Sequence, residues 1–297
     1  MPAIETERLT KLYGRQRGVE EITIAVEQGE VFGFLGPNGA GKTTTIRTLL
    51  DLLHPTSGSA RIFGLDSRRD SVTIRRRLGN LPGDFGYGKL ATGREAIALL
   101  ARLRGLPAEL DRATVLAERF HADLDRPLGQ LSRGNRQKIG LILAVFHEPD
   151  LLILDEPTSG LDPLMQEEFL ALVREERARG CAVFLSSHEL DEVERVCDRV
   201  GIIREGRLVA VERVADLLDR TPRRVSVEFA APIEETELRE LPGVSDLHAG
   251  DGHVSFKVAG DIDPVLKAIA NHVVVDLEFA RPTLEEVFLT YYEGEAS

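Results

Sequence analysis

An α/β fold is predicted for most of this chain by three features of its sequence. Apolar runs of strand length alternate with segments of helical apolar spacing up to about residue 218. Two of the runs, LLILD at 151–155 and CAVFL at 181–185, have the apolar character of buried parallel strands. A glycine-rich loop at 36–43 stands between a third run and a helical segment.

The glycine-rich loop fits the phosphate-binding pattern G-x-x-x-x-G-K-[ST]. It consists of Gly36, Pro37, Asn38, Gly39, Ala40, Gly41, Lys42 and Thr43. It follows VFGFL at 31–35 and precedes TTIRTLLDLL at 44–53, the strand and helix that distinguish this motif from an ordinary glycine-rich turn. Glycines let backbone N–H groups approach phosphate oxygens, and a helix N-terminus adds positive potential. We predict that Lys42 reaches the β- and γ-phosphates, Thr43 holds Mg²⁺, and Thr44 lies near the α-phosphate.

The length, charge and cysteine content of the chain disfavour several classes of protein. The chain has 297 residues, enough for one large or two ordinary domains, and its net charge of −12 argues against nucleic-acid binding through bulk charge. Its two cysteines fit no metal or disulfide framework and suit a reducing cytosol. The first residues lack the apolar core of a signal peptide, and IGLILAVF at 139–146 is too short for a membrane span. A role at a membrane is therefore expected only through a partner.

Two domains are predicted, one at 1–220 and one at 222–297, with a helical insert at about 84–148 in the first. Other strands are expected at 22–26 and 199–210, and helices at 93–105, 108–120, 133–147 and 166–180. The basic run at 68–77 is interpreted as a solvated helix face, with contact to a partner or anionic headgroups as the alternative. Residues 225–292 read strand, helix, hairpin, helix, strand, helix, which predicts a small α+β domain of ferredoxin-like layout.

The run at 151–155 supplies two carboxylates for the phosphate site. Asp155 and Glu156 follow four apolar residues at the end of a strand that should lie beside the phosphate loop. Asp155 is predicted to bind Mg²⁺, directly or through water, and Glu156 to accept a proton from the attacking water. A strand ending in solvated acids is the alternative, and the nearby phosphate loop disfavours it.

Three further motifs occur in a fixed order around these carboxylates. They are LSRGNRQK at 131–138, SGLD at 159–162 and SSHEL at 186–190. Together with the phosphate loop and LLILDEP, they resemble the ATP-binding-cassette (ABC) ATPases over residues 4–217. The resemblance implies a P-loop NTPase domain that binds ATP and Mg²⁺, and two copies that close head to tail.

By this resemblance, Ser132 and the Gly134 amide contact the γ-phosphate bound by the second copy. His188 senses the γ-phosphate and holds the attacking water, so catalysis rests on Glu156 and His188. Tyr13, in KLYG at 11–14, stacks on adenine. A core tyrosine and a structural histidine remain the alternatives for Tyr13 and His188.

Some positions depart from the family pattern. Arg133 and Asn135 replace signature residues, and Gly83 stands where the family usually places a glutamine that ligates Mg²⁺ and couples the site to the membrane partner. Glycine can do neither with a side chain. Asp84, the next residue, is the candidate to compensate in part.

The C-terminal segment resembles the accessory domain of ATPase subunits from bacterial drug exporters of the daunorubicin-resistance type, mainly through PTLEEVFL at 282–289. We therefore expect an ATP-hydrolysing subunit that powers a separate permease at the cytoplasmic face of the membrane, with no nucleic-acid partner. A soluble ABC ATPase of DNA repair or translation and a regulatory module without turnover are the alternatives. A small GTPase is disfavoured because the sequence has no N-K-x-D base-reading motif.

Overall fold

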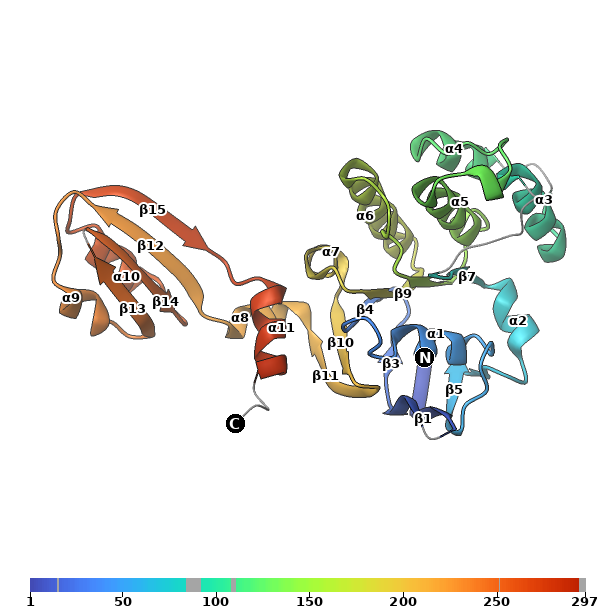
Figure 1. Ribbon diagram of the computed structural model, residues 1–297, viewed down its shortest axis with the longest axis horizontal. Helices are drawn as coiled ribbons and strands as arrows, with labels where there is room; N and C mark the ends of the chain where they lie inside the picture. The colour runs from blue at the N-terminus through green and yellow to red at the C-terminus, as the bar shows by residue number, and fades with distance from the viewer. Residues whose placement is uncertain (15, 84–91, 108–110, 251, 294–297) are drawn as a thin grey trace. The chain divides into compact units, whose positions relative to one another are not determined.

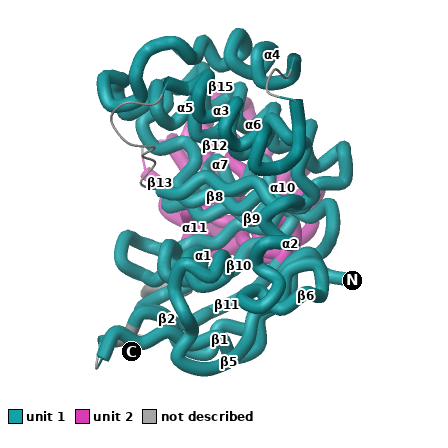
Figure 2. Tube along the Cα trace, turned by 90° about the vertical axis from the view of Figure 1, so that its right-hand side faces the viewer, with its two compact units in different colours: residues 1–212 teal, residues 213–297 magenta. Residues whose placement is uncertain are grey.

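The computed structural model describes residues 1–14, 16–83, 92–107, 111–250 and 252–293. The chain divides into two compact units, Met1–Glu212 and Arg213–Ser297 (Figure 2). Helix α8 (Val214–Arg220) belongs to the second unit, where it packs against α11 (Leu284–Glu293). The division therefore precedes α8, whereas the predicted boundary follows it.

A six-stranded sheet forms the centre of the first unit, in the order β11-β10-β4-β9-β8-β7. Its strands are β4 (Val31–Leu35), β7 (Leu78–Leu81), β8 (Leu151–Asp155), β9 (Ala182–Ser187), β10 (Arg199–Arg204) and β11 (Arg207–Arg213). Five of these strands, β10, β4, β9, β8 and β7 in spatial order, pair in parallel, so their carboxyl ends share one edge of the sheet. Every residue of β4, β8 and β9 is buried, as the apolar runs predict.

The strand expected at 199–210 is wrong as a single element. Glu205 and Gly206 adopt φ of 49° and 78°, and two consecutive left-handed residues turn the chain between β10 and β11.

Helices α1 (Lys42–Leu49), α6 (Pro163–Ala178) and α7 (Leu190–Val196) follow the ends of β4, β8 and β9 (Figure 1). Pro163 begins α6 three residues before the predicted start at 166.

A second sheet in the same unit has the order β2-β1-β5-β6, and β3 pairs with β1. Its strands are β1 (Ile4–Tyr13), β2 (Gln16–Ile22), β3 (Ala25–Val26), β5 (Ser57–Ile62) and β6 (Leu65–Asp66). The single strand expected at 22–26 is wrong. The Thr6 hydroxyl donates to the Ile22 carbonyl at 2.9 Å and accepts from the Ile24 amide at 3.0 Å, which replaces ladder bonds and separates β2 from β3.

The helical insert lies between β7 and β8, where α3, α4 and α5 gather at one end of the unit (Figure 1). Its elements are α3 (Gly93–Arg104), α4 (Asp111–Arg119), η1 (Leu128–Gln130) and α5 (Arg133–Val145). Thr92 and Glu95 form a capping box at the start of α3, and Gly105 ends it in the left-handed conformation. A short helix, α2 (Ser71–Arg76), precedes β7 within the basic run.

The second unit follows the predicted βαββαβ succession, and its strand order is β13-β14-β12-β15. Its elements are β12 (Arg223–Phe229), α9 (Glu235–Arg239), β13 (Val244–Gly250), β14 (His253–Val258), α10 (Asp263–Ile269), β15 (Val274–Ala280) and α11. Leu238, Val265 and Ile269 from the helices join Val227 and Phe256 of the sheet in one buried cluster. Among the described residues, no helix is long and apolar enough to cross a membrane.

Candidate functional site

The phosphate loop connects β4 to α1 at the carboxyl edge of the central sheet. Gly39 and Gly41 have φ of 82° and 112°, which side chains rarely tolerate. A Cβ on Gly36 would lie 2.4 Å from the Ile203 carbonyl oxygen, so this position requires glycine for packing against β10. Gly41 caps α1 without a side-chain hydrogen bond, which leaves the first amides of the helix available to an anion.

A cavity of about 260 Å³ opens above this loop. Its lining consists of Tyr13, Gly18, Pro37, Asn38, Gly39, Gly41, Lys42, Thr43, Thr44 and Glu156. Gly36 and Ala40 belong to the loop but not to this lining. Gly18 was not predicted as a site residue. A Cβ there would lie 2.8 Å from the Tyr13 ring, so glycine leaves room for the aromatic side chain.

The Lys42 ammonium is already engaged in this structure. Its Nζ donates to the Gly36 carbonyl at 2.5 Å and lies 3.1 Å from Glu156 Oε1. The side chain is buried, with 6% exposed, and Glu156 has 21% exposed. An incoming phosphate must therefore compete with the Glu156 carboxylate for this cation.

Asp155 ends β8, Glu156 follows it, and both are held by β9. Ser186 donates from its hydroxyl to Asp155 Oδ1 at 2.6 Å, and the same hydroxyl accepts from the Glu156 amide at 3.2 Å. Glu156 has φ of 51°, a left-handed conformation that turns its side chain out of the strand direction. Gln137 of α5 donates to the Glu156 and Pro157 carbonyls at 3.1 and 2.8 Å. Sequence reasoning missed Ser186 and Gln137, although both lie within the quoted motifs.

His188 lies beyond the end of β9 and contacts Glu156. Its Nδ1 is 2.5 Å from Glu156 Oε2, so Lys42 and His188 approach opposite oxygens of one carboxylate. These groups border a second cavity of about 420 Å³. Its lining consists of Asn38, Thr43, Arg47, Gly83, Arg133, Asp155, Glu156, Ser159 and His188.

The structure thus brings the phosphate loop, both carboxylates and His188 together, whereas Ser132 and Gly134 line neither cavity. The Ser132 hydroxyl caps α5 by accepting from the Asn135 amide at 3.3 Å. Gly134 packs so closely on the loop after Glu156 that a Cβ would lie 2.5 Å from the Gly160 carbonyl oxygen. Arg133 donates to the Ser159 hydroxyl at 2.6 Å, which fixes the signature loop to the same segment.

Gly83 lies beside the predicted metal ligand, where a Cβ would be 3.1 Å from Asp155 Oδ2. The position is therefore close enough for a longer side chain to reach the Asp155 carboxylate. Asp84, the predicted substitute, lies outside the described residues.

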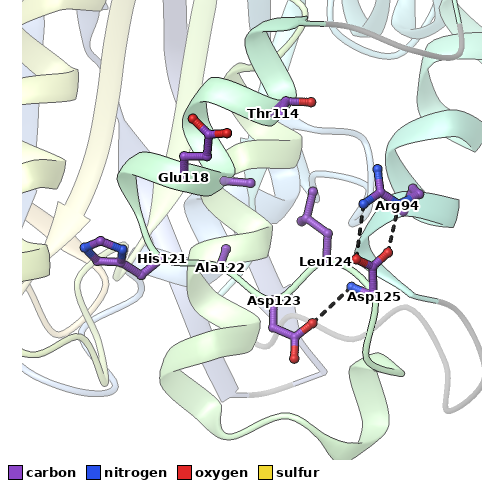
Figure 3. Close-up of a pocket in the computed structure, with 9 residues that line it drawn as sticks. Arg94, Thr114, Glu118, His121, Ala122, Asp123, Leu124 and Asp125 are labelled. Atoms are coloured by element: carbon purple, nitrogen blue, oxygen red, sulfur yellow. Dashed lines mark hydrogen bonds and ion pairs between the residues drawn. The ribbon is translucent and has the colours of Figure 1, made fainter.

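The largest of these cavities is not at this site. It measures about 500 Å³ and lies in the helical insert, between the N-terminal end of α3 and the segment that follows α4 (Figure 3). Arg94 and Asp125 form a bidentate ion pair on its wall, with Nε to Oδ1 at 2.8 Å and Nη2 to Oδ2 at 3.2 Å. The cavity shares no lining residue with the phosphate site, so we assign it no part in nucleotide chemistry.

Comparisons with known proteins agree with this geometry. The profile of the ABC transporter family matches residues 19–159. The bacitracin transport ATP-binding protein BcrA of Bacillus licheniformis is 42% identical over 209 residues, which cover 69% of this chain and 68% of the relative. Nod factor export ATP-binding protein I of Paraburkholderia xenovorans (strain LB400) is 34% identical over 293 residues, 97% of this chain and 96% of the relative.

Solved structures of ABC transporter subunits are also similar to this chain. The structure of an ATP-binding subunit of an ABC transporter superposes with a TM-score of 0.68 at 33% identity, covering 72% of this chain and 91% of that one. A dimeric bacterial ABC transporter cassette shares the fold, with a TM-score of 0.66 at 22% identity over 71% of this chain and 98% of that one. The expectation of a transporter subunit is confirmed over the alternative of a soluble ABC ATPase of DNA repair or translation. The chain belongs to the ATP-binding, ATP-hydrolysing subunits of ABC transporters.

Proposed function

We propose that this subunit hydrolyses Mg-ATP at the site formed by the phosphate loop, Asp155, Glu156 and His188. The observation that carries the proposal is that Lys42 and His188 hold opposite oxygens of the Glu156 carboxylate beside the phosphate loop. The phosphates lie on the amides at the start of α1, and Lys42 binds the β- and γ-phosphates. Tyr13, 46% exposed at the cavity wall, stacks on the adenine.

The residues present fit Mg²⁺. Asp155 Oδ2 faces Gly83 in the second cavity, and the Thr43 side chain borders the same space. A carboxylate and a hydroxyl are oxygen ligands, which Mg²⁺ prefers, so Asp155 and Thr43 would hold the ion. Bound there, the ion would neutralise charge on the phosphates. We propose two protein ligands for the ion, Asp155 and Thr43.

Glu156 acts as the general base for the attacking water. Binding of ATP draws Lys42 to the phosphates and frees Glu156 Oε1, the oxygen that Lys42 faces in this structure. Oε2 stays oriented by His188, which holds the carboxylate toward the second cavity. A positioned base of this kind typically contributes about 10²–10⁴-fold to the rate.

The active form is a dimer of two copies in head-to-tail arrangement. Ser132 and Gly134 lie away from the cavities of their own chain, and they stand at the N-terminus of α5, where the helix favours an anion. We infer that they contact the γ-phosphate bound by the second copy. Closing and reopening of this dimer drives a separate permease, and the subunit sits on the permease at the cytoplasmic face of the membrane.

The transported molecule is proposed to be a drug, an antibiotic or a lipid-like compound. The names of relatives support this class, since they include bacitracin transport, Nod factor export and daunorubicin/doxorubicin resistance. The net charge of −12 supports our expectation of no nucleic-acid partner.

Single-turnover hydrolysis of radiolabelled ATP by the full chain tests the site. Glu156→Gln should lower the rate constant by about 10²–10⁴-fold while ATP binding persists. Glu189→Gln is the matched control, because Glu189 also lies beside His188 but does not face Lys42. Near-parental hydrolysis by Glu156→Gln would refute the assignment of the base. Purification of the tagged chain from membranes, with identification of the bound integral-membrane protein, tests the permease.

A further inference from the structure

A buried carboxyl group on α7 lies just behind the catalytic pair. Glu192 is 8% exposed, and its Oε2 accepts a hydrogen bond of 2.8 Å from the Thr158 hydroxyl. Thr158 is 4% exposed and lies two residues after Glu156. The other oxygen of Glu192, Oε1, is buried without a hydrogen-bond partner among the described residues. A buried carboxyl with one oxygen unpaired is costly, so its presence calls for a role.

Helix α7 offers a rigid support for this contact. Val193 is fully buried against β4, and a Cβ on Gly33 would lie 2.8 Å from its Cγ1 and 3.0 Å from the Cys197 sulfur. The helix can approach the strand this closely only because Gly33 has no side chain. β4 leads directly into the phosphate loop, so α7 is fixed to the strand that positions Lys42.

Two contacts then join the same two segments. His188 meets Glu156 through Nδ1 and Oε2, and four residues further on Glu192 meets Thr158. The second contact is buried, whereas His188 has 44% of its side chain exposed. A buried hydrogen bond is better protected from water than an exposed one, so the Thr158–Glu192 hydrogen bond should be the stronger of the two contacts.

We propose that Glu192 is a positioning residue for ATP hydrolysis, which, by binding Thr158, holds the loop of Glu156 in register with His188. The inference rests on the proposed function, in which Glu156 and His188 serve catalysis. Glu192 touches no reacting atom. It acts through the loop 156–158, and a small displacement of a catalytic group can cost about 10²-fold in rate.

The charge state of Glu192 strengthens this role. Burial raises the pKa of Glu192 to about 7; the negative charges of Glu189 and Glu156 act in the same direction, while the Thr158 hydrogen bond and His188 oppose it. Arg195, on the same helix, pairs with Glu167 of α6, and the β4 residues facing α7 are apolar. Above pH 7 the carboxylate accepts a charge-assisted bond from Thr158, and below pH 7 the neutral acid accepts a weaker one.

The test compares kcat, KM and nucleotide affinity in the full chain. Thr158→Val removes the donor at nearly constant volume and should lower kcat by about 10- to 100-fold, with the Kd for ATP unchanged. Thr158→Ser keeps the hydroxyl and should restore most of kcat. Glu192→Gln should match the parent kcat at pH 6 and fall several-fold below it at pH 8. The parent kcat should rise through pH 7 as Glu192 ionises, whereas glutamine does not ionise and its kcat should not rise. Asp191→Asn, an exposed neighbour on α7, is the control and should keep the parent profile.

Each result is decisive for the proposal. Parental kcat in Thr158→Val, or a Glu192→Gln profile parallel to the parent from pH 6 to 8, would overturn it. Equal losses in Thr158→Val and Thr158→Ser, or a loss explained by a lower melting temperature in both, would also overturn it. Glu156→Gln separates this from the proposed function: if that variant hydrolyses ATP normally, the base is misassigned, whatever Thr158 does.

Discussion

Replacing Glu156 by glutamine should tighten nucleotide binding as well as stop hydrolysis. In the structure, Lys42 Nζ lies 3.1 Å from Glu156 Oε1. At an effective dielectric constant of about 20, this separation corresponds to a gross attraction of about 5 kcal/mol. The net value is smaller, about 1.5 kcal/mol, because desolvation offsets most of it, as for other hydrogen bonds to charged groups.

Glutamine keeps the shape of the side chain and removes the charge, so the competition for Lys42 disappears. A net gain of about 1.5 kcal/mol lowers the dissociation constant roughly tenfold. Isothermal titration calorimetry with ADP isolates this effect, since ADP has no γ-phosphate for Glu156 to repel. The pair is largely buried, so the gain should persist at raised salt.

Glu189→Gln is the control for calorimetry, because its carboxylate lies near His188 and not near Lys42. It should leave the dissociation constant for ADP unchanged. An ADP affinity in Glu156→Gln equal to or below that of the parent would show that the Lys42–Glu156 pair does not oppose binding, and the argument would be wrong.

Other variants test the remaining parts of the site. Lys42→Ala should abolish tight Mg-ATP binding at an unchanged circular dichroism spectrum, and an unchanged Kd by calorimetry would contradict the phosphate site. Ser132→Arg mixed with Lys42→Ala should recover ATPase activity through one intact composite site; no recovery, with mixed dimers demonstrated, counts against a shared site. Gly83→Gln should lower the Mg²⁺ concentration for half-maximal ATPase, because position 83 lies beside Asp155 Oδ2, and superimposable titrations would remove that role. Burial, with the positive charge of Arg104, lowers the pKa of His147 to about 4, so its contribution to stability is complete above pH 6.5 and is lost as pH falls toward 4. His147→Gln should flatten denaturant-measured stability over that range.

The local chemistry of this protein could be predicted from sequence because it is encoded in contiguous motifs. The phosphate loop depends on glycines at fixed spacing between a strand and a helix, and the strands β4 and β8 are marked by uninterrupted apolar runs. The second unit was predictable in the same way, since alternation and turn residues set its element order. Polar strands such as β1 and β5 gave no such pattern and were missed, because side-chain bonds like those of Thr6 shape that sheet.

The tertiary structure alone decided which residues meet. Parallel pairing of β4, β9 and β8 brings the ends of distant segments to one edge, and this places His188 and Lys42 on either side of Glu156. The burial of Glu192 and its bond to Thr158 leave no trace in local sequence, because a glutamate on a short helix reads as a solvated residue. Side-chain contacts across 30 or more positions depend on the packing of whole strands and helices, and that packing is a property of the folded chain.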